Sequence, residues 1–202
     1  MSKLTRNQFD VLSALATSGA MTEQELCAAT GHAAEAISKT MNELSASGYI
    51  ADGNITEAGK AALEPYTVKR AVFIAAGFGS RLVPITLNTP KPLVRVKGKR
   101  IIDTLIDAVL AAGINEIYIV RGYLGEQFDQ LLIKYPMIKF IDNEKYNEAT
   151  NILSAYCARE LLSNAYVFEA DLYLSNPTIV KKYHYESNFL SIKKERSDDW
   201  CF

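Results

Sequence analysis

The chain has 202 residues, a hydrophobic content of 49% and a formal net charge of −1, values that describe an ordinary globular protein of one large or two small domains. Two histidines leave little room for histidine-based catalysis or a zinc site. No apolar run is long enough to span a membrane, and the N-terminus lacks the apolar core of a secretory signal. The three cysteines have no metal-ligand spacing, so we expect free thiols in a reducing cytoplasm.

Residues 1–66 carry the pattern of four helices with a small hairpin before the last one. Apolar residues recur at helical spacing in three segments, and the third of these covers residues 33–47. The boundaries are set by helix caps, glycine breakers and one hairpin signal: Gly19, Thr22 with Glu25, Gly31, Asp52-Gly53-Asn54 and Thr56. The order of helix, helix, helix, hairpin and helix resembles the helix-turn-helix regulators of the winged type.

The charge of this small domain argues against DNA binding. Residues 1–66 hold four Lys and Arg but eight Asp and Glu, a net charge of −4, whereas a DNA reader needs a basic face that neutralises phosphates. The expected recognition helix offers Ser38, Lys39 and Asn42 as contacts, and the hairpin has no cation. We therefore favour a protein-contact, dimerising or regulatory role, with a homodimer among the expected assemblies, and keep DNA binding as the alternative.

Beyond a short linker at residues 67–70, residues 71–202 alternate between strands and helices. Strands are predicted at 71–75, 116–120, 137–141, 166–168 and 189–193, and helices at 101–112, 123–134 and 151–162, with 94–96 as an extension of the first loop. This alternation predicts an α/β domain with a mainly parallel, Rossmann-like sheet covered by helices on both faces. Its ligand is expected at the carboxyl ends of the strands.

The most informative segment is the loop after the first strand, A-A-G-F-G-S-R-L-V-P-I-T-L-N-T-P-K-P-L-V at residues 75–94. Gly77 and Gly79 allow backbone N–H groups to converge on an anion. Arg81 and Lys91 then supply a forked guanidinium and a point charge, which together suit a phosphate chain. A Rossmann fingerprint is excluded because its third glycine is absent and prolines follow, and a P-loop is excluded because no Gly-Lys-Ser/Thr is present.

A pair of carboxylates follows a later strand. Glu169 and Asp171 are two residues apart, so on an extended chain they point the same way. Carboxylates at the end of a strand suit a Mg²⁺ ion that bridges phosphate oxygens, because this ion keeps few protein ligands and several waters. The simpler interpretation is a pair of solvated charges. Beside the phosphate loop we favour Asp171 as a metal ligand, with Glu169 as the second candidate.

Four segments together resemble the bacterial CTP:phosphocholine cytidylyltransferases and, more loosely, the sugar-1-phosphate nucleotidylyltransferases. They are the glycine-rich loop, R-G-Y-L-G-E-Q-F at 121–128, N-E-K-Y at 143–146 with Asn151, and E-A-D-L-Y-L at 169–174. The likeness covers residues 71–202 and implies a GT-A-like nucleotidyltransferase fold. It also implies a Mg²⁺-assisted, in-line attack of a substrate phosphate on the α-phosphorus of a nucleoside triphosphate, with release of pyrophosphate. Such an enzyme would serve the biosynthesis of cell-surface polysaccharides.

The resemblance implies roles for individual residues. The nucleotide would contact Ala75, Ala76, Gly77, Gly79, Ser80, Gly122, Tyr123 and Asn151, and Mg²⁺ would contact Asp171 and Glu169. The catalytic cations would be Arg81 and Lys91, with Lys91 at the α-phosphate. Aromatic faces with nearby carboxylates hold quaternary ammonium groups, which indicates Trp200 and Tyr173 as acceptor-binding residues; a packing role for both rings is the open alternative.

Three functions stay open on this basis. The resemblance favours transfer from CTP to phosphocholine, with a sugar 1-phosphate as the alternative acceptor. A nucleotide-sensing transcriptional regulator and a non-catalytic nucleotide-binding module are the other two. The family continues past the position of Phe202 with further strands, the rest of the acceptor pocket and a second metal carboxylate. We therefore expect a longer protein or a truncated product, with an exposed sheet edge and poor catalysis by these residues alone.

Overall fold

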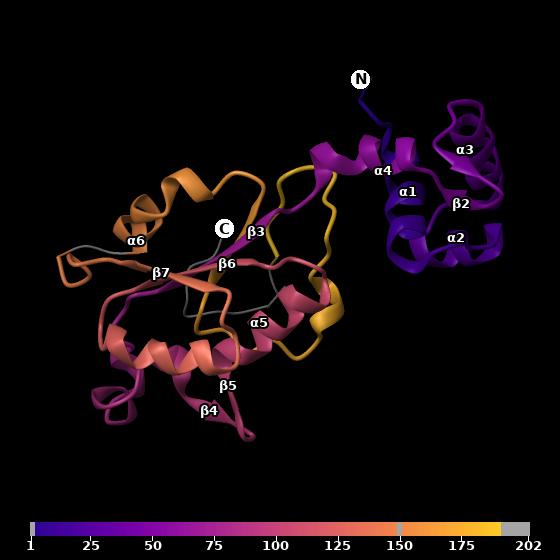
Figure 1. The fold of residues 1–202 in the computed structure, drawn as a ribbon. Helices are drawn as coiled ribbons and strands as arrows, with labels where there is room; N and C mark the ends of the chain where they lie inside the picture. Colours follow the sequence, from indigo (N-terminus) through magenta and orange to yellow (C-terminus); the bar gives the residue numbers. More distant parts are fainter. Residues whose placement is uncertain (1–2, 149–150, 191–202) are drawn as a thin grey trace, which may run out of the picture.

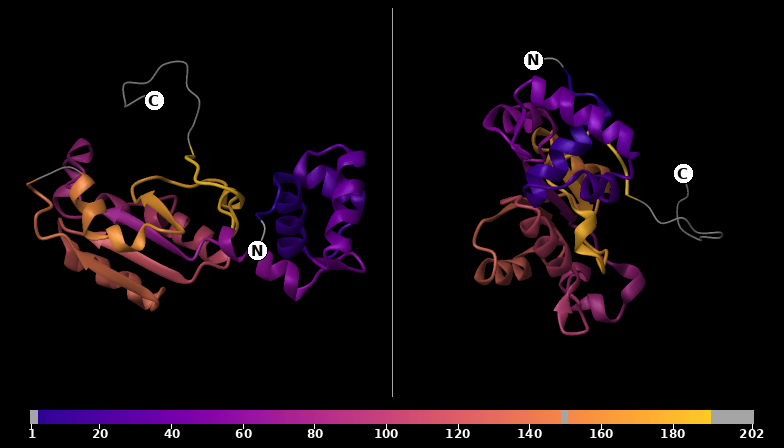
Figure 2. Two further views of the ribbon diagram at one scale, coloured as in Figure 1. Left: turned by 90° about the horizontal axis from the view of Figure 1, so that it is seen from above. Right: turned by 90° about the vertical axis from the view of Figure 1, so that its right-hand side faces the viewer.

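The computed structural model of the chain describes residues 3–148 and 151–190. It contains a small helical part at the N-terminal end and a larger part built on a four-stranded sheet (Figure 1). The two views in Figure 2 place the helical part beyond the end of the sheet at which β3 begins, so the molecule is elongated.

The helical part is a winged helix, as the sequence predicts. Its elements are α1 (Arg6–Ser18), α2 (Glu23–Thr30), α3 (Ala34–Ala46), the hairpin β1 (Ile50–Ala51) and β2 (Asn54–Ile55), and α4 (Glu57–Leu63). Capping boxes begin the first two helices: the side chain of Thr5 accepts from the backbone N–H of Gln8, and that of Thr22 accepts from the N–H of Glu25. The core of this part draws buried apolar residues from all four helices, including Leu12, Leu26, Ile37 and Leu63.

The sheet of the larger part is entirely parallel, which confirms the predicted α/β class. Its strands are β3 (Arg70–Ala75), β6 (Glu116–Arg121), β7 (Ile138–Asp142) and β8 (Ala165–Glu169), in the spatial order β7-β6-β3-β8. The register pairs Ala75 with Arg121 and Ile74 with Glu169. The carboxyl ends of β3, β6 and β8 therefore meet at one edge, where the segments that follow these strands lie next to one another.

Helices cover both faces of the sheet, so this part has three layers (Figure 1). On one face α5 (Ile101–Ala111) and a 3₁₀ helix, η5 (Gly125–Ile133), bury apolar residues in the same core as Phe73. On the other face α6 (Asn151–Cys157) packs in a smaller cluster with Val72. Because successive residues of β3 point to opposite faces and both faces are covered, the strand is apolar at almost every position.

The segment 123–134, predicted as one helix, forms only the 3₁₀ helix η5. Leu124 adopts a left-handed backbone conformation with φ 48°, and the N–H of Gly125 donates to the carbonyl of Gly122 at 3.0 Å. These torsions begin the segment with a tight turn in place of a regular α-helical turn. The predicted helix was therefore wrong in its first two residues and its last, and its type is 3₁₀.

The helix predicted at 151–162 is divided into two pieces. α6 ends before Ala158, and a 3₁₀ helix, η6 (Arg159–Leu161), follows it. Ala158 has φ −100° and ψ 8°, which lies outside the α-helical region, and the guanidinium of Arg159 donates to the carbonyl of Tyr156 at 3.1 Å. A cation thus caps one of the carbonyls that the break leaves without a helical partner, and the α-helix ends earlier than predicted.

Residues 94–96 do not simply extend the glycine-rich loop. Arg95–Val96 (β4) pairs antiparallel with Lys99–Arg100 (β5) across a turn in which Lys97 and Gly98 both have positive φ. Positive φ at both central residues is the geometry of a type I′ hairpin, whose commonest signals are Asn-Gly and Asp-Gly. The Lys-Gly dipeptide carries that signal more weakly, and the prediction missed it.

The strand predicted at 189–193 does not form at its first two residues, and the other three lie outside the described residues. Cys27 and Cys157 are free thiols, as expected, and Cys201 lies outside the described residues. Among the residues that the structure describes, no helix has the length and apolar character needed to cross a membrane.

Candidate active site

The segments that follow β3, β6 and β8 are held together at the carboxyl edge of the sheet. The backbone N–H of Tyr123, after β6, donates to the carbonyl of Ala76, after β3, at 3.1 Å. The N–H of Ala170, after β8, donates to the carbonyl of Ile74 in β3, also at 3.1 Å. Two backbone hydrogen bonds therefore fix the spacing between the glycine-rich loop and its neighbours, at the edge where parallel α/β sheets bind ligands.

Gly79 shapes the glycine-rich loop. It has φ 64°, and a Cβ on it would lie 3.0 Å from Thr86 Cγ2 and 3.1 Å from Lys91 Cβ. The buried hydroxyl of Thr86, a residue that the sequence analysis missed, donates to the carbonyl of Gly79 at 2.9 Å and folds the loop back on itself. Gly77 is exposed, and a Cβ on it would meet no atom within 4 Å. Packing and torsion therefore require glycine at Gly79, whereas the space above Gly77 is open to a ligand.

The other predicted residues of this loop divide between a buried and an exposed side. Ala75 and Ala76 are buried at the end of β3 and lie beneath the loop. Ser80 and Arg81 are exposed and begin a short 3₁₀ helix, η2 (Ser80–Leu82). Small side chains on the sheet side and polar side chains on the solvent side suit a charged ligand that enters from water and lies against the backbone.

An ion pair joins the glycine-rich loop to the end of β8. Lys91 Nζ lies 2.6 Å from Asp171 Oδ2, and the exposed fractions of the two side chains are 27% and 33%. The two residues are 80 positions apart in the sequence, and the sequence analysis assigned both to one site. The structure brings them into direct contact. Each side chain could bind a ligand group in place of the other, because an ammonium also binds phosphate and a carboxylate also binds a hard divalent cation.

The carboxylates at this edge do not form a closed metal cage. Glu169 is the last residue of β8 and is exposed, at the same strand end as Asp171. Across residues 3–148 and 151–190, no group of three or more His, Cys, Asp or Glu side chains is placed to hold a metal ion. Two carboxylates open to solvent nevertheless fit Mg²⁺, because this ion keeps several waters and binds through one or two carboxylates together with substrate phosphates.

Three aromatic rings that the sequence analysis did not group together lie on the β6 side of the site. The ring centroids of Phe78 and Tyr123 are 4.8 Å apart, and those of Phe78 and Tyr146 are 5.4 Å apart. Gly122 allows this arrangement, because a Cβ there would lie 2.5 Å from Tyr146 Cβ. The side chain of Phe78 stays 46% exposed between the two loop glycines, so part of its surface is available to a ligand.

Asn151, Tyr173 and Trp200 are the other residues that the sequence predicts for the site. Asn151 begins α6, and Tyr173, which follows β8, is 45% exposed. Trp200 lies outside the described residues. Asn143, which was quoted in a motif but given no role, is buried and donates from Nδ2 to Ser154 Oγ at 3.0 Å. This bond ties the end of β7 to α6.

The fold and the geometry of this edge define a parallel α/β domain with a polar site at the carboxyl edge of its sheet, next to a separate winged helix. The sequence model described as "Nucleotidyl transferase" matches residues 70–197, and the model described as "MarR family" matches residues 2–53. The first match covers more than half of the chain. The chain therefore belongs to the nucleotidyl transferase family, with a MarR-type winged helix at its N-terminal end.

Several relatives of the larger part are cytidylyltransferases whose names give different acceptors. The chain is 39% identical over 131 residues to the choline-phosphate cytidylyltransferase of Streptococcus pneumoniae, a match that covers 65% of this chain and 57% of that protein. It is 39% identical over 135 residues to the 2-aminoethylphosphonate cytidylyltransferase of Lancefieldella rimae, covering 65% and 55%. The solved CTP:phosphocholine cytidylyltransferase of Streptococcus pneumoniae superposes with a TM-score of 0.54 at 43% identity, covering 57% of this chain and 50% of that one. The chain thus spans about half the length of these relatives.

Proposed function

We propose that this chain provides the nucleotide-binding half of a cytidylyltransferase, which transfers CMP from CTP to a phosphorylated small molecule and releases pyrophosphate. The observation that carries the proposal is the 2.6 Å contact between Lys91 and Asp171, which unites the cation of the glycine-rich loop with the carboxylate after β8. Membership of the nucleotidyl transferase family supports the reaction class, and the names of the relatives support CTP.

In the proposed site the glycine-rich loop holds the triphosphate. The turn at Gly79 and Ser80 presents backbone N–H groups to phosphate oxygens, and Arg81 adds a forked guanidinium at the solvent side. Lys91 leaves Asp171 and neutralises the charge that develops on the α-phosphate as the acceptor phosphate attacks in line. No covalent intermediate with the protein is needed, so these residues act by positioning and charge stabilisation.

The nucleoside would lie over the end of β3 in this proposal. Ala75 and Ala76 form the buried floor, and the open space above Gly77 leaves room for the ribose and base. Gly122 and Tyr123 border the base from the β6 side. Asn151, at the start of α6, adds an amide for hydrogen bonding to the nucleoside.

Asp171, with Glu169 beside it, would hold Mg²⁺. Bound there, the ion would neutralise phosphate charge and make the α-phosphorus easier to attack. The ammonium of Lys91 contacts one oxygen of Asp171. Asp171 therefore becomes fully available to the ion when the triphosphate draws Lys91 away, which couples metal binding to nucleotide binding.

The acceptor is a phosphorylated compound that the relatives do not fix. Three relatives are named for choline phosphate, 2-aminoethylphosphonate and phosphoglutamine, at 39%, 39% and 36% identity, so the degree of identity does not choose among them. We favour phosphocholine, with Tyr173 and Trp200 as aromatic contacts for the quaternary ammonium, and keep sugar 1-phosphates as the alternative. Free thiols support a cytoplasmic reaction, whose product would enter the biosynthesis of cell-surface polysaccharides.

For the winged helix we propose a protein-contact or regulatory role. On α3, Lys39 and Asn42 are exposed, but so are Glu35 and Glu43, and the turn of the hairpin presents Asp52. An acidic surface of this kind repels DNA phosphates. The MarR family match favours a second candidate function, a DNA-binding regulator that senses nucleotide. A salt-dependent mobility shift of duplex DNA at micromolar protein would support that second function.

A substrate panel tests the proposed reaction. Pyrophosphate release is measured with CTP, UTP, GTP and ATP, each combined with phosphocholine, phosphoethanolamine, 2-aminoethylphosphonate or a sugar 1-phosphate, with Mg²⁺ and with EDTA as the control. We expect release with CTP above the other nucleotides and no release in EDTA. Release with sugar 1-phosphates alone would change the acceptor class. Binding of CTP without release from any acceptor would make these residues a nucleotide-binding module.

A further inference from the structure

Two stretches of chain join the winged helix to the sheet domain. One is the direct connection at residues 67–70. The other is residues 172–185, which we call the strap. It begins directly after Asp171 at the carboxyl edge of the sheet and returns to the opposite edge, where the winged helix lies (Figure 1). A residue of the proposed metal site is therefore the immediate neighbour of a segment that ends at the winged helix.

The strap is held against the sheet domain along its path. The backbone N–H of Leu174 donates to Thr104 Oγ1 in α5 at 3.0 Å, and the 3₁₀ helix η7 (Pro177–Ile179) packs against α5. Nearer the winged helix, the hydroxyl of Tyr166 in β8 accepts from the N–H of Lys181 at 2.9 Å. These anchors make the strap a fixed connection, so a displacement at one end is passed toward the other.

At its far end the strap pairs with the direct connection. The two segments form a short antiparallel ladder, and both therefore enter the winged helix together. Three backbone contacts make up the ladder: Val68 N–H to Lys182 O at 2.8 Å, the bridge between Thr67 and Tyr183, and His184 N–H to Tyr66 O at 2.9 Å.

The last residue of the strap completes the core of the winged helix. The ring of Tyr185 stacks on Tyr66 at a centroid distance of 5.6 Å and lies 5.4 Å from the ring of Phe9 in α1. Its hydroxyl donates to the carbonyl of Leu4 at 3.1 Å, and the N–H of Leu4 donates in turn to the hydroxyl of Tyr66 at 3.1 Å. The winged helix is thus packed against the strap by aromatic contact and hydrogen bonds.

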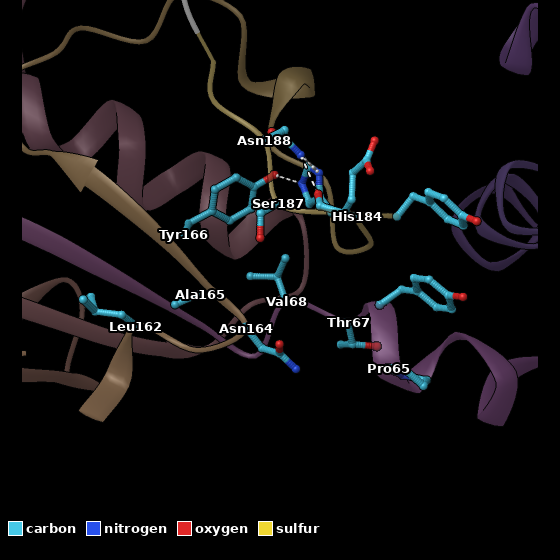
Figure 3. Close-up of a pocket in the computed structure, with 13 residues that line it drawn as sticks. Pro65, Thr67, Val68, Leu162, Asn164, Ala165, Tyr166, His184, Ser187 and Asn188 are labelled. Atoms are coloured by element: carbon cyan, nitrogen blue, oxygen red, sulfur yellow. Dashed lines mark hydrogen bonds between the residues drawn. The ribbon is translucent and has the colours of Figure 1, made fainter. Parts of the chain in front are cut away.

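A cavity of about 340 Å³ lies where the strap, the direct connection and the start of β8 meet (Figure 3). The imidazole of His184 points across it, with Nε2 against the hydroxyl of Tyr166 and Nδ1 against the amide of Asn188, which donates at 2.9 Å. Side-chain hydrogen bonds line this pocket, beside the backbone ladder and the aromatic contacts of Tyr185. The junction therefore has space on one side of the ladder into which the strap can move.

We propose that the strap makes the winged helix a positioning element of the Asp171 site, so that binding at either end changes the other. Exchange of Lys91 for a metal ion would move Asp171, the residue that directly precedes the strap. A partner bound to the winged helix moves Tyr185, at which the strap ends. Because coupling free energies are reciprocal, an effect in one direction requires an equal effect on affinity in the other. The inference rests on the proposed function for the identity of the ligand at Asp171.

Hydrogen exchange on the full chain, with and without CTP and Mg²⁺, tests this coupling. We expect nucleotide to change the exchange of α1 and α4, which lie far from the glycine-rich loop. The Tyr185→Ala variant should lose that change and should alter the dissociation constant for CTP with Mg²⁺ by threefold or more. Tyr156→Ala, at a tyrosine on α6 that is 60% exposed, is the matched control and should preserve both properties.

The outcomes separate the coupling from the proposed function. Binding of CTP without any change in α1 and α4 of the wild-type chain would overturn the coupling alone, as would a change that Tyr185→Ala retains. Absence of CTP binding would overturn the proposed function and the coupling with it. If Tyr185→Ala does not fold, Tyr185→Phe keeps the ring contacts and removes the bond to Leu4. A reduced nucleotide-dependent change in that variant supports the coupling, and an unchanged one contradicts it.

Discussion

Ion pairs of two kinds occur in the sheet domain, and the difference bears on function. Arg100 Nε donates to both carboxylate oxygens of Asp103, and the side chains are 10% and 9% exposed. The two residues of this pair are three positions apart, and the pair is buried at the N-terminal end of α5. The pair of Lys91 and Asp171 joins distant segments and stays accessible to water. Accessible pairs contribute about 0–1 kcal/mol to stability, so stability alone gives little reason for the second pair.

Replacement of Lys91 therefore separates catalysis from folding. We expect Lys91→Ala to lower the rate of pyrophosphate release by about 10²–10³-fold, the typical cost of removing one preorganised group that stabilises transition-state charge. The thermal unfolding midpoint should move little, because the lost pair is partly solvated. Lys139→Ala, at an exposed lysine in β7, is the matched control. Near-normal turnover in Lys91→Ala would remove this residue from the mechanism.

At the scale of elements, the sequence predicted those features that depend on residues close together in the chain. The capping box of Thr22 and Glu25 forms as expected, because both partners lie within one helical turn. The 3₁₀ character of η5 was not predictable in this way. It depends on a left-handed Leu124, and Arg121 reaches forward to the carbonyl of Gly125 while also pairing with Asp142 from β7. Those contacts exist only after the sheet has assembled.

The contact between α4 and the hairpin segment was also not predictable from the sequence, and it gives a test in which two effects oppose each other. Alanine has a higher helix propensity than glycine by about 1 kcal/mol, so Gly59→Ala should stabilise α4 in isolation. A Cβ on Gly59 would, however, lie 2.3 Å from Tyr49 O and 2.7 Å from Ile55 Cγ1. Overpacking against a fixed backbone costs about 1–3 kcal/mol, and at this separation we expect it to outweigh the propensity.

Urea denaturation of Gly59→Ala should accordingly show a net loss of stability. Ala58→Gly, at the exposed neighbouring position, is the control. It changes the helix propensity by the same amount in the opposite direction and creates no steric overlap, so it measures the propensity alone. A more stable Gly59→Ala chain would mean that the hairpin does not lie against α4 as closely as the 2.3 Å separation requires.

At the scale of the whole molecule, the sequence predicted the two parts better than their connection. The Lys91–Asp171 site could be anticipated across 80 residues because the resemblance to a known family supplied both halves. The strap could not, because the partners of Tyr183 and Tyr185 lie far away in the sequence, in α1 and in the segment before β3. An alternating Tyr-His-Tyr was the available signal, and it is typical of many exposed strands.

His184, a residue of the strap, gives a prediction of how the stability of the protein depends on pH. Burial, followed by the nearby charge of Lys181, lowers the pKa of His184 below its usual value of about 6.5. Among the described residues its ring contacts the neutral groups of Tyr166 and Asn188, and no carboxylate is paired with it. The folded chain therefore binds a proton at this residue less readily than the unfolded chain does. Its contribution to stability is complete above pH 6.5 and is lost as the pH falls from there toward the lower folded-state pKa.

We expect the free energy of unfolding to decline between pH 7.5 and pH 5.5, with part of the decline due to His184. Urea titrations of His184→Gln at the two pH values should show a smaller decline, because the variant has no proton to bind at this position. His32→Gln is the control, since that ring lies 2.9 Å from Asp10 within the winged helix and away from the strap. An equal decline in wild type and His184→Gln would show that acid acts elsewhere. If the stability of His184→Gln declines less than that of wild type, its winged helix should also be more resistant to proteolytic release at pH 5.5, because the junction stays neutral in this variant.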